Sequence, residues 1–263
     1  MILQEKLIKD IIEKSKIDDR IDSTMMYGSF TQGCGDAFSD VEFYIFMKDN
    51  EIDNFNSEEW ISDIYPIYTH FFNEFGTEVV IFKNMIRGEF HFLPEKEMSI
   101  IEDFKSVGYF PDLEAMCVCD KNGNLKKHLS TLSNCEVERK TLDNVKFVID
   151  NLINAVLLGI NVLKRGEVAR SLESLWFAQK YYLQLIRLLE NKTNHWVNPT
   201  KQLEKEISDE FYERYILSTS NLDKVNILTA YSNIIDNLIH IMSLLEFEQD
   251  SYTSLLSELR KYI

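Results

Sequence analysis

The fold of this chain is decided by the stretch GSFTQGCGDAFSDVEF, residues 28–43. A Gly-Ser turn opens the stretch, and an acidic pair, Asp40 and Glu42, stands near its end. Side chains alternate between the two faces of a strand, so these two carboxylates share one face while Val41 and Phe43 point to the other. The pattern predicts a strand with an apolar face toward the core and an acidic face away from it.

The spacing of the turn and the acidic pair indicates binding of a metal ion and of phosphate groups. Two carboxylates side by side on a rigid strand suit Mg²⁺, which prefers oxygen ligands at about 2.0–2.1 Å. A turn at Gly28 and Ser29 can bring backbone N–H groups and a hydroxyl close to phosphate oxygens. Asp and Glu make up 43 of the 263 residues, so about seven acidic-x-acidic pairs arise by chance. The turn, the spacing and the apolar flanks together therefore carry the prediction of a site for Mg²⁺ and a nucleoside triphosphate.

The competing interpretation is a plain turn followed by a solvated strand face. It leaves unexplained why two like charges stand together on an otherwise apolar strand. A bound metal ion would remove their repulsion.

A third carboxylate is expected at such a site. Two-metal group transfer uses several acids, and one acid must accept the proton of the attacking hydroxyl. Glu89 is the leading candidate, because in the expected strand 88–93 it faces away from the aromatic side chains. An ion pair with Arg87 is the alternative for Glu89, and Glu78 is the second candidate for the acid. His91 shares the face of Glu89, although a hydrogen-bonded core histidine is the more common role.

The triphosphate also needs cations. Arg170 is placed near the start of an expected helix, where the helix dipole favours anions rather than cations. Binding of the triphosphate would explain that position. An exposed ion pair with Glu167 or Glu173 explains it equally well.

Composition excludes some classes of function. The formal net charge is −15, and no basic cluster exceeds two residues, which disfavours a nucleic-acid partner. An acidic cleft instead attracts Mg²⁺ and small cationic molecules. The beginning of the chain lacks a signal-peptide pattern, and no stretch approaches the roughly 18 apolar residues of a membrane span. We therefore expect a cytoplasmic protein without a membrane segment.

The cysteines indicate neither zinc nor a disulfide framework. Cys117 and Cys119 stand too close together for the usual zinc spacing, and no histidine pair completes a site. All four, with Cys34 and Cys135, are expected to be reduced thiols.

The pattern of elements predicts an α+β chain with two domains. Residues 1–135 are expected to form a mixed sheet with flanking helices, and residues 136–263 a helical bundle. Strands are expected at 24–27, 41–47, 78–82, 88–93 and 116–119. Helices are expected at 3–16, from about 58 with Ser57 as its cap, and at 142–164, 170–190, 202–218, 222–248 and 251–262.

These motifs resemble those of known enzymes. The Gly-Ser turn, the gap of ten residues and Asp40-Val41-Glu42 are similar to the signature of the DNA polymerase β-like nucleotidyltransferases. Longer blocks resemble the lincosamide nucleotidyltransferases within that superfamily. The blocks are residues 25–31, 39–46, 76–82, 86–93, 159–167, 170–173 and 203–208.

The resemblance implies an antibiotic-resistance enzyme. Such enzymes transfer AMP from ATP to a hydroxyl of lincomycin or clindamycin and release pyrophosphate. The resemblance implies two Mg²⁺ ions held by Asp40, Glu42 and Glu89, with Glu89 as general base, and a triphosphate gripped by Gly28 and Ser29. It also implies a nucleotidyltransferase catalytic domain followed by a helical bundle, a lincosamide as small-molecule partner, and often a homodimer.

Two alternatives remain open. The same chemistry could act on an aminoglycoside or on a protein hydroxyl, or the chain could be a non-catalytic nucleotide-binding relative. Trp176, Tyr181 and Tyr182 are candidates for part of the drug pocket, although aromatic residues at helical spacing usually belong to the core. The drug hydroxyl that is modified and the preferred nucleotide also stay open.

Overall fold

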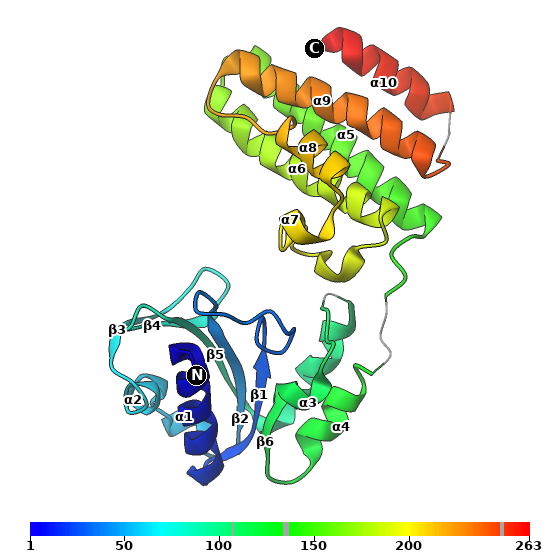
Figure 1. The fold of residues 1–263 in the computed structure, drawn as a ribbon. Coiled ribbons are helices and arrows are strands. Elements are labelled where there is room, and N and C mark those ends of the chain that lie inside the picture. The colour runs from blue at the N-terminus through cyan, green and yellow to red at the C-terminus, as the bar shows by residue number, and fades with distance from the viewer. Residues whose placement is uncertain (107, 134–136, 248–249) are drawn as a thin grey trace. The chain divides into compact units, whose positions relative to one another are not determined.

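The protein is described by a computed structural model that covers residues 1–106, 108–133, 137–247 and 250–263 (Figure 1). It divides into two compact units, Met1–Val137 and Glu138–Ile263. Cys135 and the expected domain boundary at 135/136 lie outside the described residues. Cys34, Cys117 and Cys119 are free thiols, as the sequence predicts.

A six-stranded mixed sheet forms the centre of the N-terminal unit. Its strand order is β3-β4-β5-β2-β1-β6. The pair β2 and β5 is parallel, and every other neighbouring pair is antiparallel. The strands are β1 Ile21–Tyr27, β2 Val41–Met47, β3 Ile67–Phe72, β4 Glu78–Phe82, β5 Arg87–Pro94 and β6 Cys117–Asp120.

One face of the sheet packs on two helices, α1 (Leu3–Ile17) and α2 (Ser57–Ser62), which lie on the same side in Figure 1. Phe43 and Phe90 point into this layer and are fully buried, with their rings stacked at 6.1 Å between centroids. Ile11 of α1 is buried with them. We call this the core face. Its burial confirms the predicted apolar face of the strand at 41–47.

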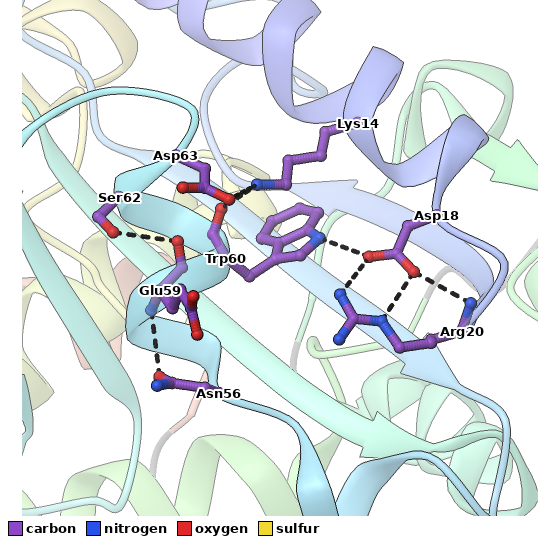
Figure 2. A network of polar contacts seen from close by, with 8 residues as sticks. All are labelled: Lys14, Asp18, Arg20, Asn56, Glu59, Trp60, Ser62 and Asp63. Carbon is purple, nitrogen blue, oxygen red and sulfur yellow. Dashed lines mark hydrogen bonds and ion pairs between the residues drawn. The ribbon is translucent and has the colours of Figure 1, made fainter.

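Polar contacts join α1 to α2 at the edge of this layer, as Figure 2 shows. Lys14 donates to the carbonyl of Trp60 at 2.8 Å and to Asp63 at 3.0 Å. The Trp60 indole donates to Asp18 at 3.0 Å, and Arg20 holds the same carboxylate through two nitrogens. The bonds to Arg20 hold the pKa of Asp18 at about 2.

One local expectation is wrong, and one strand was not predicted. The cap of α2 is Asn56, whose side chain accepts from the N–H of Glu59 at 3.1 Å, and Ser57 is the first helical residue. The strand β3 was not expected, because its side chains alternate in type without a polar face. It is an edge strand whose apolar side chains are partly exposed.

The opposite face of the sheet carries a smaller apolar layer that covers only part of it. Met25 and Phe46 are buried there by the 3₁₀ segment η2 and by α4. Phe104 of η2 contacts the ring of Tyr44 at 5.4 Å between centroids. Beyond Tyr44, this face carries polar side chains, and we call that part the site face. The covering elements are η2 Glu95–Ser106, α3 Leu113–Met116 and α4 Asn124–Ser130, and a further 3₁₀ turn, η1, spans Ile52–Asn54.

The C-terminal unit is helical, as predicted. Its helices are α5 Leu142–Lys164, α6 Val168–Leu189, α7 Leu203–Glu206, α8 Asp209–Ile216, α9 Lys224–Leu244 and α10 Asp250–Tyr262, with a 3₁₀ turn, η3, at Thr193–His195. The single helix expected at 202–218 is two helices. Ile207 is extended between them, and Glu190 accepts bonds from the N–H and the hydroxyl of Ser208, which fixes the break.

A close crossing ties three helices of this unit together. The Tyr231 hydroxyl of α9 donates to the Ser171 carbonyl of α6 at 2.7 Å, and the Ser171 hydroxyl donates to the Gly159 carbonyl of α5 at 2.8 Å. A Cβ on Gly159 would stand 1.7 Å from the Tyr231 hydroxyl oxygen. The crossing therefore requires glycine at residue 159.

The helix α5 has the predicted length but is more apolar than expected. By length and composition it could cross a membrane, contrary to the expectation that no stretch comes near that length. More than half of its most apolar window is buried inside the helical unit. Val148, Leu152 and Ile160 belong to that core, which identifies α5 as a core helix of the bundle.

Candidate active site

The loop after β1 begins with a tight turn at Gly28. This glycine has φ +79°, a conformation that other residues rarely adopt. Its carbonyl accepts from the N–H and the hydroxyl of Thr31, and the carbonyl of Ser29 accepts from two later N–H groups. A Cβ at residue 28 would stand 1.5 Å from Oε2 of Glu42. The Glu42 carboxylate therefore lies directly against the turn, as the spacing of turn and acidic pair suggested.

The parallel pairing of β2 and β5 brings the third acid to the same place. Glu42 is the register partner of Glu89, so both side chains leave the same face on strands about 4.8 Å apart. Arg87 joins Glu89 to Asp40. Its Nη1 donates to Asp40 at 2.6 Å, and its Nη2 donates to Glu89. Asp40, Glu42 and Glu89 thus meet at one end of the site face.

The ion pair between Arg87 and Glu89, given above as the alternative role of Glu89, is present. It does not remove Glu89 from the acidic group, because the same guanidinium also binds Asp40. The side chains of Asp40 and Arg87 are each 37% exposed and that of Glu89 is 20% exposed. The cluster is therefore partly exposed to solvent.

Tyr27 binds the other oxygen of Glu89 and links it to His91. The Tyr27 hydroxyl donates to Glu89 Oε2 at 3.3 Å and lies 3.2 Å from His91 Nε2. The Tyr27 hydroxyl uses its one O–H to donate to Glu89. It can therefore only accept from His91, which assigns the proton of the neutral imidazole to Nε2. The His91 ring stacks on Tyr44, with centroids 4.1 Å apart and planes 7° from parallel. Glu89 is therefore oriented through both of its oxygens.

Burial and charge fix the protonation of these partners. Burial, assisted by the charges of Glu42 and Glu89, raises the pKa of Tyr27 far above its usual range. Burial lowers the pKa of His91, although Glu89 opposes the effect. At neutral pH the phenol keeps its proton and the imidazole is uncharged. Tyr27 and His91 are therefore both neutral partners of Glu89.

Glu78, the second candidate for the acid, lies elsewhere. It is the register partner of Phe90, so its side chain lies on the core face of the sheet, whereas that of Glu89 lies on the site face. Only 4% of the residue is exposed, and His70 binds its carboxylate at 2.5 Å. Glu78 is a buried partner of His70 and takes no part in the acidic cluster.

The donor atoms of the cluster suit magnesium. Asp40, Glu42 and Glu89 offer carboxylate oxygens, the ligand type that Mg²⁺ selects. Within the described residues, no three His, Cys, Asp or Glu side chains stand in a metal-binding arrangement. At this site Arg87 engages two of the three acids, so it occupies oxygens that an ion would use. The residue types fit the ion, and the side chains are arranged around a guanidinium.

A comparison of the chain with family profiles finds one match. Residues 141–260 match the profile described as lincosamide nucleotidyltransferase-like, C-terminal domain. The matched residues span nearly the whole helical unit, so this unit is similar to the C-terminal domain of that family. The sequence resemblance to this family is confirmed there.

Two solved structures are distantly similar to the chain. An aminoglycoside 6-adenyltransferase from Bacillus subtilis is 12% identical, with a TM-score of 0.43 over 98% of this chain and 96% of that one. A nucleotidyltransferase-like protein from Exiguobacterium sibiricum is 14% identical, with a TM-score of 0.41 over 93% and 78%. None of the curated proteins compared with the chain matches it.

The helical unit carries a groove between α5 and α6, with a volume of about 320 Å³. Its lining mixes amides, charges and aromatic rings: Asn151, Asn154, Ala155, Leu158, Arg170, Glu173, Ser174, Phe177 and Tyr181. Arg170, predicted to bind the triphosphate, is one wall of this groove. It pairs with Glu167 at 3.1 Å, the alternative that the sequence left open, and its role toward the triphosphate stays a prediction.

The three aromatic candidates for the drug pocket separate in this domain. Tyr181 lines the groove, whereas Tyr182 is fully buried in the core of the helical unit and cannot face a ligand on its surface. Trp176 is 60% exposed and packs edge to face on Phe177. Tyr181 remains a candidate, and the prediction for Tyr182 is wrong, because the next helix position is rotated by about 100° and here points into the core.

Sequence reasoning missed Tyr27 and Tyr44 as site residues. Tyr27 reads as an ordinary apolar strand residue, and its role depends on pairing with Glu42 across β1 and β2. Its position directly before the Gly-Ser turn is the signal that could have identified it.

Proposed function

We propose that this protein transfers AMP from ATP to a hydroxyl of a small antibiotic, with a lincosamide as the first acceptor to test. The single observation that carries the proposal is the meeting of Asp40, Glu42 and Glu89 beside the Gly28 turn. The match of the helical unit to a lincosamide nucleotidyltransferase-like domain supports the choice of acceptor.

In the proposed reaction, Glu89 is the general base. Its carboxylate takes the proton of the acceptor hydroxyl as that oxygen attacks the α-phosphorus of ATP. The new O–P bond forms while the bond to pyrophosphate breaks, and the proton stays on Glu89 until water removes it. Tyr27 orients Glu89 for this step through one oxygen, and Arg87 holds the other oxygen in the metal-free protein. Orientation of the base supplies a large part of the rate in such transfers.

Asp40 and Glu42, with Glu89 beside them, are the residues that would hold magnesium. When bound there, the ion would neutralise triphosphate charge and favour departure of pyrophosphate. The Gly28–Ser29 turn lies against Glu42 and would receive the phosphates, since a tight turn without a Cβ lets them approach the backbone.

The α5–α6 groove is the candidate surface of the helical unit for the acceptor. Lincosamides and aminoglycosides are both glycosidic amines, and each needs an acid for the amine and amides for sugar hydroxyls. Glu173, Asn151 and Asn154 offer those groups, and Tyr181 offers a ring for apolar contact. The net charge of −15 favours cationic acceptors of either class.

Aminoglycosides and protein hydroxyls therefore belong in the same experiment. Purified protein is incubated with ATP, Mg²⁺ and one acceptor at a time: lincomycin, clindamycin, several aminoglycosides and a protein mixture. Mass spectrometry should find one adenylyl group added to a lincosamide. If an aminoglycoside or a protein were modified instead, the proposed acceptor would be wrong and that molecule would take its place. ATP binding without any transfer would favour a non-catalytic protein.

Two further expectations are kept as proposals. Use of ATP favours the cytoplasm, where the nucleotide is abundant. A homodimer is expected from the family resemblance, and light scattering of the purified chain would measure it.

A further inference from the structure

Arg87 stands at the centre of the candidate site without a role in the proposed chemistry beyond orientation. It opens β5 two residues before Glu89, so both side chains leave the same face of the strand. One guanidinium nitrogen binds Asp40 at 2.6 Å and another binds Glu89. In the described residues, Asp40 and Glu89 each form one ion pair, and in both cases the partner is Arg87.

The charge of the cluster explains why a cation is needed. Asp40, Glu42 and Glu89 place three carboxylates together in a chain whose net charge is −15. Like charges on neighbouring strands repel, and partial burial strengthens the repulsion. A guanidinium is always charged in proteins, and that of Arg87 contacts two of the three carboxylates. The guanidinium offsets the repulsion while no metal ion is present.

A guanidinium and a metal ion compete for these carboxylates. Arg87 engages Oδ2 of Asp40 and Oε1 of Glu89, two of the oxygens that Mg²⁺ could use, and a divalent ion beside the guanidinium would repel it. Arg87 has a long side chain that is 37% exposed, so it can leave without moving the strand. Its planar donors match phosphate oxygens, which arrive with the nucleotide.

We propose that Arg87 is an exchangeable counter-ion: it pairs with Asp40 and Glu89 in the metal-free protein, is displaced by the divalent cation, and then binds nucleotide phosphate. This inference rests on the proposed function, since it assumes that the cluster receives a metal–nucleotide complex. The positive charge stays at the site throughout and changes its partner from carboxylate to phosphate.

The rival role for Arg87 is that of a permanent clamp that shapes the acidic cluster for the metal. The two roles predict opposite effects on metal affinity. Loss of a competitor strengthens metal binding, whereas loss of a clamp weakens it or leaves it unchanged.

The test measures Mn²⁺ binding to the full chain by electron paramagnetic resonance, without nucleotide or acceptor. Arg87→Met should bind Mn²⁺ about tenfold more tightly than the unaltered protein, because two partly exposed ion pairs no longer compete. Arg20→Met is the matched control, since Arg20 is an ion-paired arginine of the same unit that contacts Asp18. Its Mn²⁺ affinity should be unchanged.

A second measurement follows the other half of the exchange. With Mn²⁺ saturating, Arg87→Met should bind a non-hydrolysable ATP analogue about tenfold more weakly than Arg20→Met, since a phosphate contact is lost. Unchanged or weaker Mn²⁺ binding in Arg87→Met would overturn the proposal, and so would unchanged binding of the analogue.

A conservative variant protects the test against misfolding. Arg87→Lys keeps the charge but cannot bridge two carboxylates with a planar fork. It should bind Mn²⁺ with an affinity between those of the unaltered protein and Arg87→Met, and an affinity at or below the unaltered value would also count against the exchange. These binding measurements involve no transfer reaction. If no acceptor were ever modified, the proposed function would be wrong, but the measured exchange of Arg87 would be unaffected.

Discussion

The Glu42 carboxylate lies against the Cα of Gly28, so close that a Cβ at residue 28 would stand 1.5 Å from Glu42 Oε2. This contact joins the turn expected to receive phosphates to an acid expected to bind metal. Gly28 is therefore required by two features at once: its positive φ and the position of Glu42.

Replacing this glycine should damage activity more than stability. Gly28→Ala forces Glu42 away from the cluster, so we expect adenylyl transfer to fall at least about 100-fold. The strained φ should cost about 1–2 kcal/mol of unfolding free energy. Gly76→Ala is the matched control, because Gly76 has φ +76° with no atom within 4 Å of a Cβ. It should show a similar loss of stability with unchanged kcat, and equal activities of the two variants would contradict the role of Gly28.

Loss of the Tyr27 hydroxyl should slow the reaction without unfolding the protein. Tyr27→Phe leaves Glu89 Oε2 without this donor and leaves His91 without this acceptor. We expect kcat to fall about tenfold, the effect of losing one bond that orients a base, with little change in KM for ATP. The matched control is Tyr68→Phe, whose ring is 65% exposed on β3. A kcat equal to that of the control would show that Tyr27 does not position Glu89.

Acid should remove the contribution of Asp18. Its pKa is about 2 in the folded protein against the ordinary 3.8, so its ionised form stabilises the fold above about pH 4. That contribution, at most about 2 kcal/mol, is lost as the pH falls from about 4 to 2. Asp18→Asn should be less stable near pH 7 and equal to the unaltered protein near pH 2. Urea unfolding at several pH values measures this, with exposed Asp19→Asn as control, and a constant difference at all pH values would refute it.

The crossing of α5, α6 and α9 predicts that Gly159→Ala destabilises the helical unit. Crowding against Tyr231 costs about 1–3 kcal/mol and the displaced hydroxyl loses a bond worth about 1 kcal/mol. The higher helix propensity of alanine returns about 1 kcal/mol. The net loss should be about 1–3 kcal/mol in denaturant unfolding. Leu157→Ala, at an exposed position of the same helix, should lose less than about 1 kcal/mol, and a stabilised Gly159→Ala would contradict the packing described.

Sequence alone could predict the components of the site more readily than their arrangement. The strand at 41–47 and the shared face of Glu89 and His91 follow from alternation, which is a local property. The parallel register of Glu42 with Glu89 joins residues far apart in the chain, and no local pattern specifies it. For the same reason Glu78 was a candidate, although its register with Phe90 places it on the other face.

The double role of Arg87 was beyond sequence reasoning as well. A pair with Glu89 follows from their spacing, but the bond to Asp40 depends on β2 lying beside β5. In the helical unit, the apolar periodicity of α5 predicted a helix correctly, whereas the groove lining of Tyr181 and the burial of Tyr182 depend on how α6 packs. Packing of elements, rather than their type, is what the sequence left undetermined.

The most direct test of the account is the rate of AMP transfer from ATP to an accepted antibiotic in Glu89→Gln and in the control Glu97→Gln. Glutamine keeps the size of residue 89 but cannot take a proton, and Glu97 is an exposed acid of η2 in the same unit. We predict a fall of about 10²–10⁴-fold for Glu89→Gln, with ATP still bound, and an unchanged rate for Glu97→Gln. A Glu89→Gln variant that transfers AMP as fast as the control would contradict the assignment of the active site.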